Sequence, residues 1–200
     1  MERSNDTTPL GTLAVHRDLD TELKALAARL RASTVRVRDG DESAGSGIVW
    51  TKSGLIVTNA HVVRHDFASV ELDDGRILRG TLLARDPQRD LAVLSVNATT
   101  LVAAPIGDSD ALRVGEIVVA FGNPLGMVGA MTVGIVHAKP NTNAGIRGKW
   151  VQANVTLAPG NSGGPLADHR GRVIGVNSMT ARGVALAVPS AVVTRFLDGR

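Results

Sequence analysis

Residues 159–166 read Pro-Gly-Asn-Ser-Gly-Gly-Pro-Leu, a glycine-rich turn around a single serine. A serine hydroxyl acts as a nucleophile where a turn exposes it and where backbone N–H groups point at the oxygen that becomes negative during attack. The surrounding glycines permit the unusual backbone angles that such a turn needs. The stretch therefore predicts Ser162 as a nucleophile, with an oxyanion hole formed by Gly160, Asn161 and Ser162. The alternative interpretation is a glycine-rich hairpin turn that contains a serine by chance.

The same stretch decides between two fold classes, because Gly160-x-Ser162-x-Gly164 also matches the nucleophile elbow of α/β-hydrolases. That fold requires a helix directly after the serine, and it places the aspartate and then the histidine later in the chain. Here Pro165 and a β-like run follow the serine, and His169 is the only histidine downstream. The sequence therefore favours a fold built from strands.

Short apolar runs separated by turn residues fill most of the chain from residue 34 onward. The first group of predicted strands is 34–38, 46–51, 55–58, 69–72, 77–84 and 91–96. The second group is 116–121, 131–138, 149–155, 173–178 and 184–188. Two sets of five or six short strands predict two small barrels rather than α/β units.

The strand pattern divides the chain into an N-terminal extension and a double-barrel domain. The extension is residues 1–33, in which 18–31 is predicted as a helix because leucines recur there at helical spacing, with Asp18 or Asp20 as its cap. The domain spans 34–200. Its parts are a first barrel over about 34–103, a second barrel over about 104–188 and a short C-terminal helix over 189–198, which Pro189 opens.

A candidate base and a candidate orienting carboxylate precede Ser162 in the chain. His61 follows an apolar strand, and Asp90 precedes another. Taken alone, such a histidine is usually structural and such an aspartate usually belongs to a turn. Together with an activated serine they are the groups of a catalytic triad, in the order His, Asp, Ser. Because His61 and Asp90 fall in the first barrel and Ser162 in the second, the sequence predicts a site in a cleft between the barrels.

Five motifs, in order along the chain, carry a resemblance to a known family. They are Thr58-Asn59-Ala60-His61-Val62-Val63, Asp90-Leu91-Ala92-Val93-Leu94, Phe121-Gly122-Asn123-Pro124-Leu125-Gly126, Gly134-Ile135-Val136 and Gly160-Asn161-Ser162-Gly163-Gly164-Pro165-Leu166. With these motifs, residues 33–197 resemble the protease domain of the HtrA/Deg family of trypsin-like serine proteases. The resemblance implies an all-β, chymotrypsin-like fold of two six-stranded barrels. It also implies a serine endopeptidase that hydrolyses unfolded or damaged proteins through an acyl-enzyme, without ATP or a cofactor, using His61, Asp90 and Ser162.

Three features depart from the family pattern. The segment before the nucleophile usually resembles Thr-Asp-Ala-Ala-Ile-Asn-Pro, but here Asn154 stands in place of the acidic residue. The stretch 177–184 is short, so the loop beside the specificity pocket is trimmed. No PDZ domain follows Arg200 in this sequence, so the resemblance concerns the protease domain alone.

The specificity pocket of a double-barrel protease lies between the segment before the serine and the strand after it. Here these segments are 156–159 and 175–179, and neither contains Asp or Glu. Burying a substrate Lys or Arg there without a partner charge would be strongly unfavourable. The predicted substrate contacts are Thr156, Leu157, Val176, Asn177 and Ser178. The sequence therefore predicts cleavage after small or medium aliphatic residues such as Val, Ala or Leu.

Composition narrows the chemistry further. The chain has 22 Lys and Arg against 19 Asp and Glu, and no basic run lies beside an aromatic platform, so nucleic acid is not an expected partner. Without cysteine, disulfides and cysteine-based zinc sites are excluded. His61 and His65 stand four apart, as in a metal-binding helix, but Val62 occupies the place of the glutamate in His-Glu-x-x-His, so no metal is expected.

The expected partners are polypeptide substrates and further copies of the chain, because the resemblance implies a trimer. No stretch reaches the roughly 20 apolar residues of a membrane span, and the polar residues 1–10 contain no secretion signal. The resemblance implies a periplasmic or other extracytoplasmic location, whereas a chain complete as given would stay in the cytoplasm. The main alternative function is a protease-like peptide-binding or chaperone module with little or no hydrolysis.

Overall fold

The computed structural model describes residues 10–40, 43–98, 100–123, 129–140 and 149–199. The strands of the first half are β1 (Thr34–Asp39), β2 (Ser43–Val49), β3 (Leu55–Thr58), β4 (Phe67–Glu71), β5 (Ile77–Asp86) and β6 (Leu91–Val96). Those of the second half are β7 (Ile117–Gly122), β8 (Ala130–Ala138), β9 (Val151–Ala153), β10 (Pro165–Asp168), β11 (Val173–Ala181) and β12 (Val184–Pro189). The two helices are α1 (Leu10–Ala32) and α2 (Ser190–Asp198).

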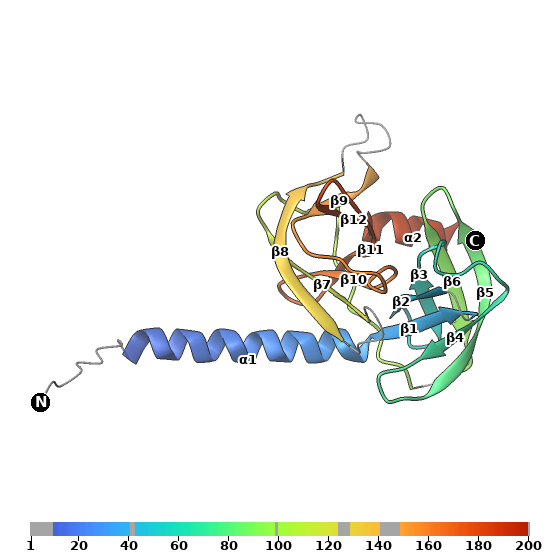
Figure 1. Ribbon diagram of the computed structural model, residues 1–200, viewed down its shortest axis with the longest axis horizontal. Helices are drawn as coiled ribbons and strands as arrows, with labels where there is room; N and C mark the ends of the chain where they lie inside the picture. The colour runs from blue at the N-terminus through green and yellow to red at the C-terminus, as the bar shows by residue number, and fades with distance from the viewer. Residues whose placement is uncertain (1–9, 41–42, 99, 124–128, 141–148, 200) are drawn as a thin grey trace, which may run out of the picture.

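The strands close into two antiparallel barrels that lie side by side (Figure 1). Around the first barrel the strand order is β1-β2-β3-β6-β5-β4, and around the second it is β10-β11-β12-β9-β8-β7. This arrangement confirms the predicted all-β fold of two six-stranded barrels, and it excludes the α/β-hydrolase alternative.

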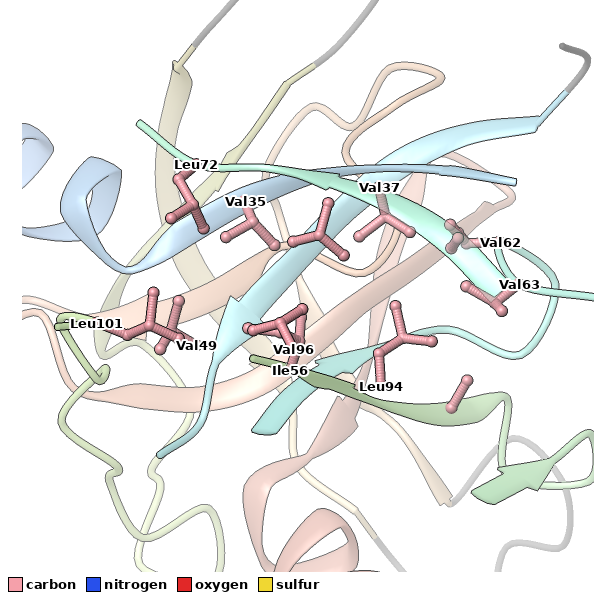
Figure 2. Close-up of a cluster of buried hydrophobic side chains, with 13 residues drawn as sticks. Val35, Val37, Val49, Ile56, Val62, Val63, Leu72, Leu94, Val96 and Leu101 are labelled. Carbon is pink, nitrogen blue, oxygen red and sulfur yellow. The ribbon is translucent and has the colours of Figure 1, made fainter. Parts of the chain in front are cut away.

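The interior of the first barrel is filled by the side chains that alternate along its strands. Val35 and Val37 on β1 are at most 2% exposed, while the residue between them is only half-buried. Figure 2 shows these valines pointing toward Ile56 and Leu94 from the opposite wall. Full burial of each such side chain stabilises the fold by about 1.5–3 kcal/mol.

A separate apolar cluster joins the two barrels. The first barrel contributes Ile48, Val57 and Leu91, and the second contributes Val173 and Val176, which are all fully buried. Because native cores are close-packed, such a cluster fixes how the barrels sit against each other. It therefore also fixes the distance between groups that the two barrels present at their junction.

One strand was missing from the sequence prediction. β10 directly follows the glycine-rich turn and begins with Pro165, so the β-like run after the serine was too short, beside these turn residues, to be placed among the predicted strands. Proline fits this position because the β10 strand starts there. Leu166 pairs with Ala120 of β7 and with Gly175 of β11, and this pairing completes the second barrel.

The N-terminal helix is longer than predicted and extends away from the barrels (Figure 1). It runs through Asp18 and Asp20, and Asp20 accepts a bond from Lys24 at 2.7 Å instead of capping the helix. The last two turns dock on the second barrel, where Leu26 and Leu30 pack against Phe121 and its neighbours. At the other end of the chain, α2 starts at Ser190, with Pro189 as its N-cap residue. Neither helix, over the residues described, has the length and apolar character needed to cross a bilayer.

Candidate active site

His61 and Asp90 meet because β3 and β6 are neighbours in the first barrel. Thr58, the last residue of β3, pairs with Ala92 near the start of β6. The chain leaves β3 into the turn that carries His61 and enters β6 directly after Asp90. The register therefore places both side chains at the same end of the strand pair.

The imidazole of His61 is held by the carboxylate of Asp90. Its Nδ1 lies 2.9 Å from each carboxylate oxygen, and the backbone N–H of His61 donates to Oδ1 at 3.1 Å. The Asp90 side chain is 13% exposed, against 45% for His61. A carboxylate at Nδ1 favours the tautomer that carries its proton there, which leaves Nε2 free to accept a proton. This pair can act as a general base with its orienting carboxylate.

Asp90 adopts an uncommon backbone conformation. Its φ of 55° is left-handed, a region that aspartate tolerates better than most residues. The fully buried Asn59 donates from Nδ2 to the Asp90 carbonyl at 2.9 Å and holds the peptide there. The left-handed turn directs the carboxylate toward His61, and its cost is consistent with a functional position.

Ser178 links the first barrel to Ser162. Its hydroxyl donates to Asp90 Oδ2 at 2.5 Å, and its carbonyl accepts the Ser162 hydroxyl at 2.8 Å. Among the residues that the structure describes, no hydrogen bond joins Ser162 to the His61 ring. The three predicted triad residues thus belong to one hydrogen-bonded network, in which the Ser162 hydroxyl points at a carbonyl instead of the base.

The turn before Ser162 presents two unused N–H groups. Gly160 has a φ of 101°, and the N–H of Asn161 donates to the Ala158 carbonyl at 3.0 Å. Within the described parts of the chain, the N–H groups of Gly160 and Ser162 have no hydrogen-bond partner. These two groups can bind an oxyanion.

Asn161 was predicted to contribute to the oxyanion hole, but its backbone N–H is not free to do so, which corrects the prediction. Its N–H is used within the turn, and its amide oxygen is buried against Gly122.

The loop that carries Ser162 is fastened to β11. The N–H of Gly163 donates to the Asn177 carbonyl, and the N–H of Asn177 donates to the Gly164 carbonyl, both at 2.8 Å. The Asn177 side chain is buried and donates to the Pro165 carbonyl at 2.9 Å. Asn177 was predicted to contact substrate, but its side chain supports this loop instead.

The predicted pocket wall is only partly where the sequence placed it. Thr156 is exposed, and Leu157 is half-buried against the core of the second barrel. Val176 is fully buried in the cluster between the barrels, so it cannot contact a substrate. This part of β11, residues 173–178, is buried along its whole length, and Val176 packs between the barrels.

Two further residues hold the turn that carries His61. The Nε of Arg85 donates to the carbonyls of Ala60 at 3.0 Å and Val63 at 2.9 Å. The buried carboxylate of Asp39 accepts the N–H groups of Arg64 at 2.5 Å and His65 at 3.2 Å. Sequence reasoning missed both residues, because neither lies near His61 in the chain or in a recognisable motif.

Asp39 is buried, and burial alone would raise the pKa of its carboxyl group. The bonds from the Arg64 N–H, the His65 ring and the His65 N–H outweigh this effect and lower the pKa below its usual value. A lowered pKa in the folded state means that Asp39 stabilises the fold above the unfolded-state pKa of about 3.9. This contribution is lost as the pH falls through the lowered folded-state value.

We expect Asp39→Asn to lower the free energy of unfolding by about 2 kcal/mol at pH 7, because one acceptor oxygen becomes an amide that faces a backbone N–H. The deficit should begin to shrink as the pH falls below the unfolded-state pKa of about 3.9. It should be smallest below the lowered folded-state pKa, where the folded wild-type carboxyl group is protonated too. Urea unfolding at several pH values measures both effects. Asp74→Asn is the matched control: Asp74 also has a lowered pKa, but its side chain is 52% exposed, so its loss should matter far less. A deficit that does not depend on pH would contradict this account.

His61 and His65, whose spacing resembles that of a metal-binding helix, contact different carboxylates. His61 pairs with Asp90, whereas the Nδ1 of His65 lies 2.9 Å from Asp39 Oδ1. In the described residues no group of three or more His, Cys, Asp or Glu is placed to hold a metal ion. His61 and His65 therefore do not point at a common site in the described structure.

Comparison with known proteins gives a consistent assignment. Residues 45–176 match the family described as the trypsin-like peptidase domain. A protein of Brucella suis named "probable periplasmic serine endoprotease DegP-like" is 40% identical over 181 residues, which cover 84% of this chain and 35% of that protein. "Serine protease HTRA2, mitochondrial" of Drosophila persimilis is 39% identical over 165 residues, covering 78% of this chain and 39% of that protein. This chain therefore spans little more than a third of the length of these relatives.

A solved structure of a variant of the HtrA-type protease AlgW with a tripeptide superposes with a TM-score of 0.78 at 30% sequence identity. The superposition covers 86% of this chain and 61% of that one. Of the motifs that carried the resemblance in the sequence, residues 124–126 lie outside the described part of the chain.

Proposed function

Because the chain belongs to the trypsin-like peptidase family and carries an HtrA-type protease domain, we propose that it is a serine endopeptidase with His61, Asp90 and Ser162 as its triad. The observation that carries the proposal is the network from His61 through Asp90 and Ser178 to Ser162. It joins a base, its orienting carboxylate and a hydroxyl across the junction of the two barrels.

In the reaction, the Ser162 hydroxyl leaves the Ser178 carbonyl, gives its proton to Nε2 of His61 and attacks the peptide carbonyl carbon. The negative oxygen of the tetrahedral intermediate is bound by the N–H groups of Gly160 and Ser162. His61 then protonates the leaving amine, and an acyl-enzyme remains. Water repeats the cycle with His61 as base. Asp90 stabilises the imidazolium that forms in each half.

Labelling with a fluorophosphonate tests the proposal, because this reagent phosphonylates a serine that is activated as a nucleophile, with loss of fluoride. We expect stoichiometric labelling, with the adduct on Ser162 in a peptide mass map, together with cleavage of unfolded casein. A folded protein that takes up no label but still binds unfolded polypeptide would favour the alternative of a peptide-binding or chaperone module.

For the substrate, we propose unfolded or damaged proteins cleaved after small or medium aliphatic residues. Leu157, in the segment before Ser162, is half-buried and offers a partly exposed apolar side chain. Met179 is 46% exposed beside Ser178. No acidic residue lies in 156–159 or 175–179 to pair with a substrate cation.

We expect a peptide with Val before the scissile bond to be cleaved at least tenfold faster than the same peptide with Lys. Burying a Val side chain is favourable by about 1.5–3 kcal/mol, whereas an unpaired ammonium group resists burial. Mass spectrometry of a peptide library digested to low conversion measures the preference. Dominant cleavage after Lys or Arg would show that an acidic residue from elsewhere reaches the pocket.

For assembly and location, we propose a trimer in an extracytoplasmic compartment, in line with the family resemblance and with the periplasmic relative's name. The apolar stripe of α1 supports self-association. It continues beyond Leu26 and Leu30 to Leu23, which is half-buried, and to Leu19, which is 53% exposed.

A further inference from the structure

Among the described residues of the first barrel, Ser46, in the middle of β2, makes the most hydrogen bonds to the Ser162 loop. Its hydroxyl donates to the Gly160 carbonyl at 2.7 Å and accepts the N–H of Asn123 at 2.9 Å. Its backbone N–H donates to the Ser162 carbonyl at 2.7 Å. Ser46 is fully buried, so water does not compete for these bonds.

The bond to Gly160 acts on one particular peptide unit. The peptide between Gly160 and Asn161 is held at its carbonyl by Ser46 and at its N–H by the Ala158 carbonyl. A peptide unit is planar, so fixing both of its ends fixes its orientation. The two candidate oxyanion donors, the N–H groups of Gly160 and Ser162, belong to the peptide units directly before and after it.

We infer that Ser46 is a positioning residue that keeps the oxyanion hole formed before substrate arrives. Without its hydroxyl, the Gly160–Asn161 peptide can rotate, and the neighbouring N–H groups lose their common direction. Pre-orientation matters because donors that are already in place need no reorganisation when the negative charge develops. The inference rests on the proposed serine-protease function and concerns the Gly160–Ser162 turn of that same site.

Ser46→Ala tests the inference through the split between kcat and KM. Loss of a single oxyanion donor lowers kcat by about 10²–10³, so a loosened hole should lower it by about tenfold to a hundredfold. KM should change little, because the hole binds the transition state rather than the substrate. Affinity for a peptide aldehyde, whose adduct carries the same oxyanion, should fall by a similar factor. Ser46→Cys, with a weaker donor, should be intermediate.

Ser190→Ala is a matched control. Ser190 is also buried, and its hydroxyl also donates to a distant carbonyl, that of Gly107 at 2.7 Å, and accepts a backbone N–H, that of Ser109 at 3.2 Å. Its removal should cost comparable stability without changing kcat. Each rate is divided by the concentration of active sites, which fluorophosphonate titration counts. Unfolded molecules in a preparation therefore do not change the measured kcat.

A fall in kcat and in aldehyde affinity confined to the Ser46 variants supports the inference. Turnover of Ser46→Ala within twofold of wild type, or an equal loss in Ser190→Ala, overturns it. Wild-type protein that takes up no fluorophosphonate would contradict the proposed function instead. The inference then still has a test, because amide hydrogen exchange of Asn161 should be faster in Ser46→Ala than in wild type, and unchanged exchange would overturn it.

Discussion

Ser162→Ala is expected to reduce casein cleavage by about four to six orders of magnitude while leaving the fold intact. The substitution removes the atom that forms the acyl-enzyme, and nothing in the network can replace it. The only described hydrogen bond lost is the one to the Ser178 carbonyl, so the free energy of unfolding should change by about 1 kcal/mol or less. Proteolysis assays and urea unfolding of the same preparation measure both quantities.

Ser53→Ala serves as the control for removing a serine hydroxyl. Ser53 is exposed, and its hydroxyl bonds only with Thr51 among the described residues. This variant should cleave casein and bind fluorophosphonate like wild type. If Ser162→Ala kept turnover within tenfold of wild type, another residue would have to be the nucleophile, and the triad assignment would fail.

The double-barrel fold was predictable because its signal is local. Alternating Val, Ile and Leu along short runs reports strands that are buried on one face, and those runs were recognised in both halves of the chain. β10 was not among the predicted strands, because Pro165 and the preceding glycines mark a turn at its first residue. The helix α1 was predicted too short, because Asp18 and Asp20 resemble N-cap residues. In the structure, Asp20 lies inside the helix and accepts a hydrogen bond from Lys24, one turn later.

The site was predictable only as far as its linear motifs reach. His61, Asp90 and Ser162 each stand in a recognisable local pattern, and whether they form a triad remains a prediction. Ser46 and Arg85 carry no such pattern. Their role arises from contacts with residues far away in the chain, which single-sequence patterns do not encode. Val176 shows the opposite kind of error. It was predicted to contact substrate because it lies in the segment 175–179, but its side chain packs in the core between the barrels.

Gly163 occupies the most crowded glycine position next to the candidate nucleophile. A Cβ placed there would lie 2.0 Å from the Ser46 carbonyl oxygen and 2.3 Å from Thr58 Oγ1. The Thr58 hydroxyl itself donates to that carbonyl at 2.7 Å, so neither atom can move away freely. The residue also has a φ of 85°, which side-chain-bearing residues rarely adopt.

Gly163→Ala should therefore destabilise the protein by about 3–5 kcal/mol and lower activity per folded molecule by at least a hundredfold. Part of the stability loss is the left-handed backbone, which costs about 1–2 kcal/mol for a residue with a Cβ. The remainder is overpacking against atoms that cannot retreat. The activity loss follows because the collision pushes the Ser162 loop away from β2. Urea unfolding measures the loss of stability. Casein cleavage, assayed at urea concentrations below the unfolding midpoint, measures the loss of activity.

Gly75→Ala separates the two causes. Gly75 has nearly the same φ, 83°, but a Cβ there would meet no atom within 4 Å. This control should lose only the backbone part, about 1–2 kcal/mol, and keep full activity. Equal losses in the two variants would mean that the Ser162 loop yields easily, so that close contact between the barrels does not hold it. A larger loss in Gly163→Ala would instead show that the loop is confined by β2, which is the condition under which Ser46 can fix the orientation of the oxyanion turn.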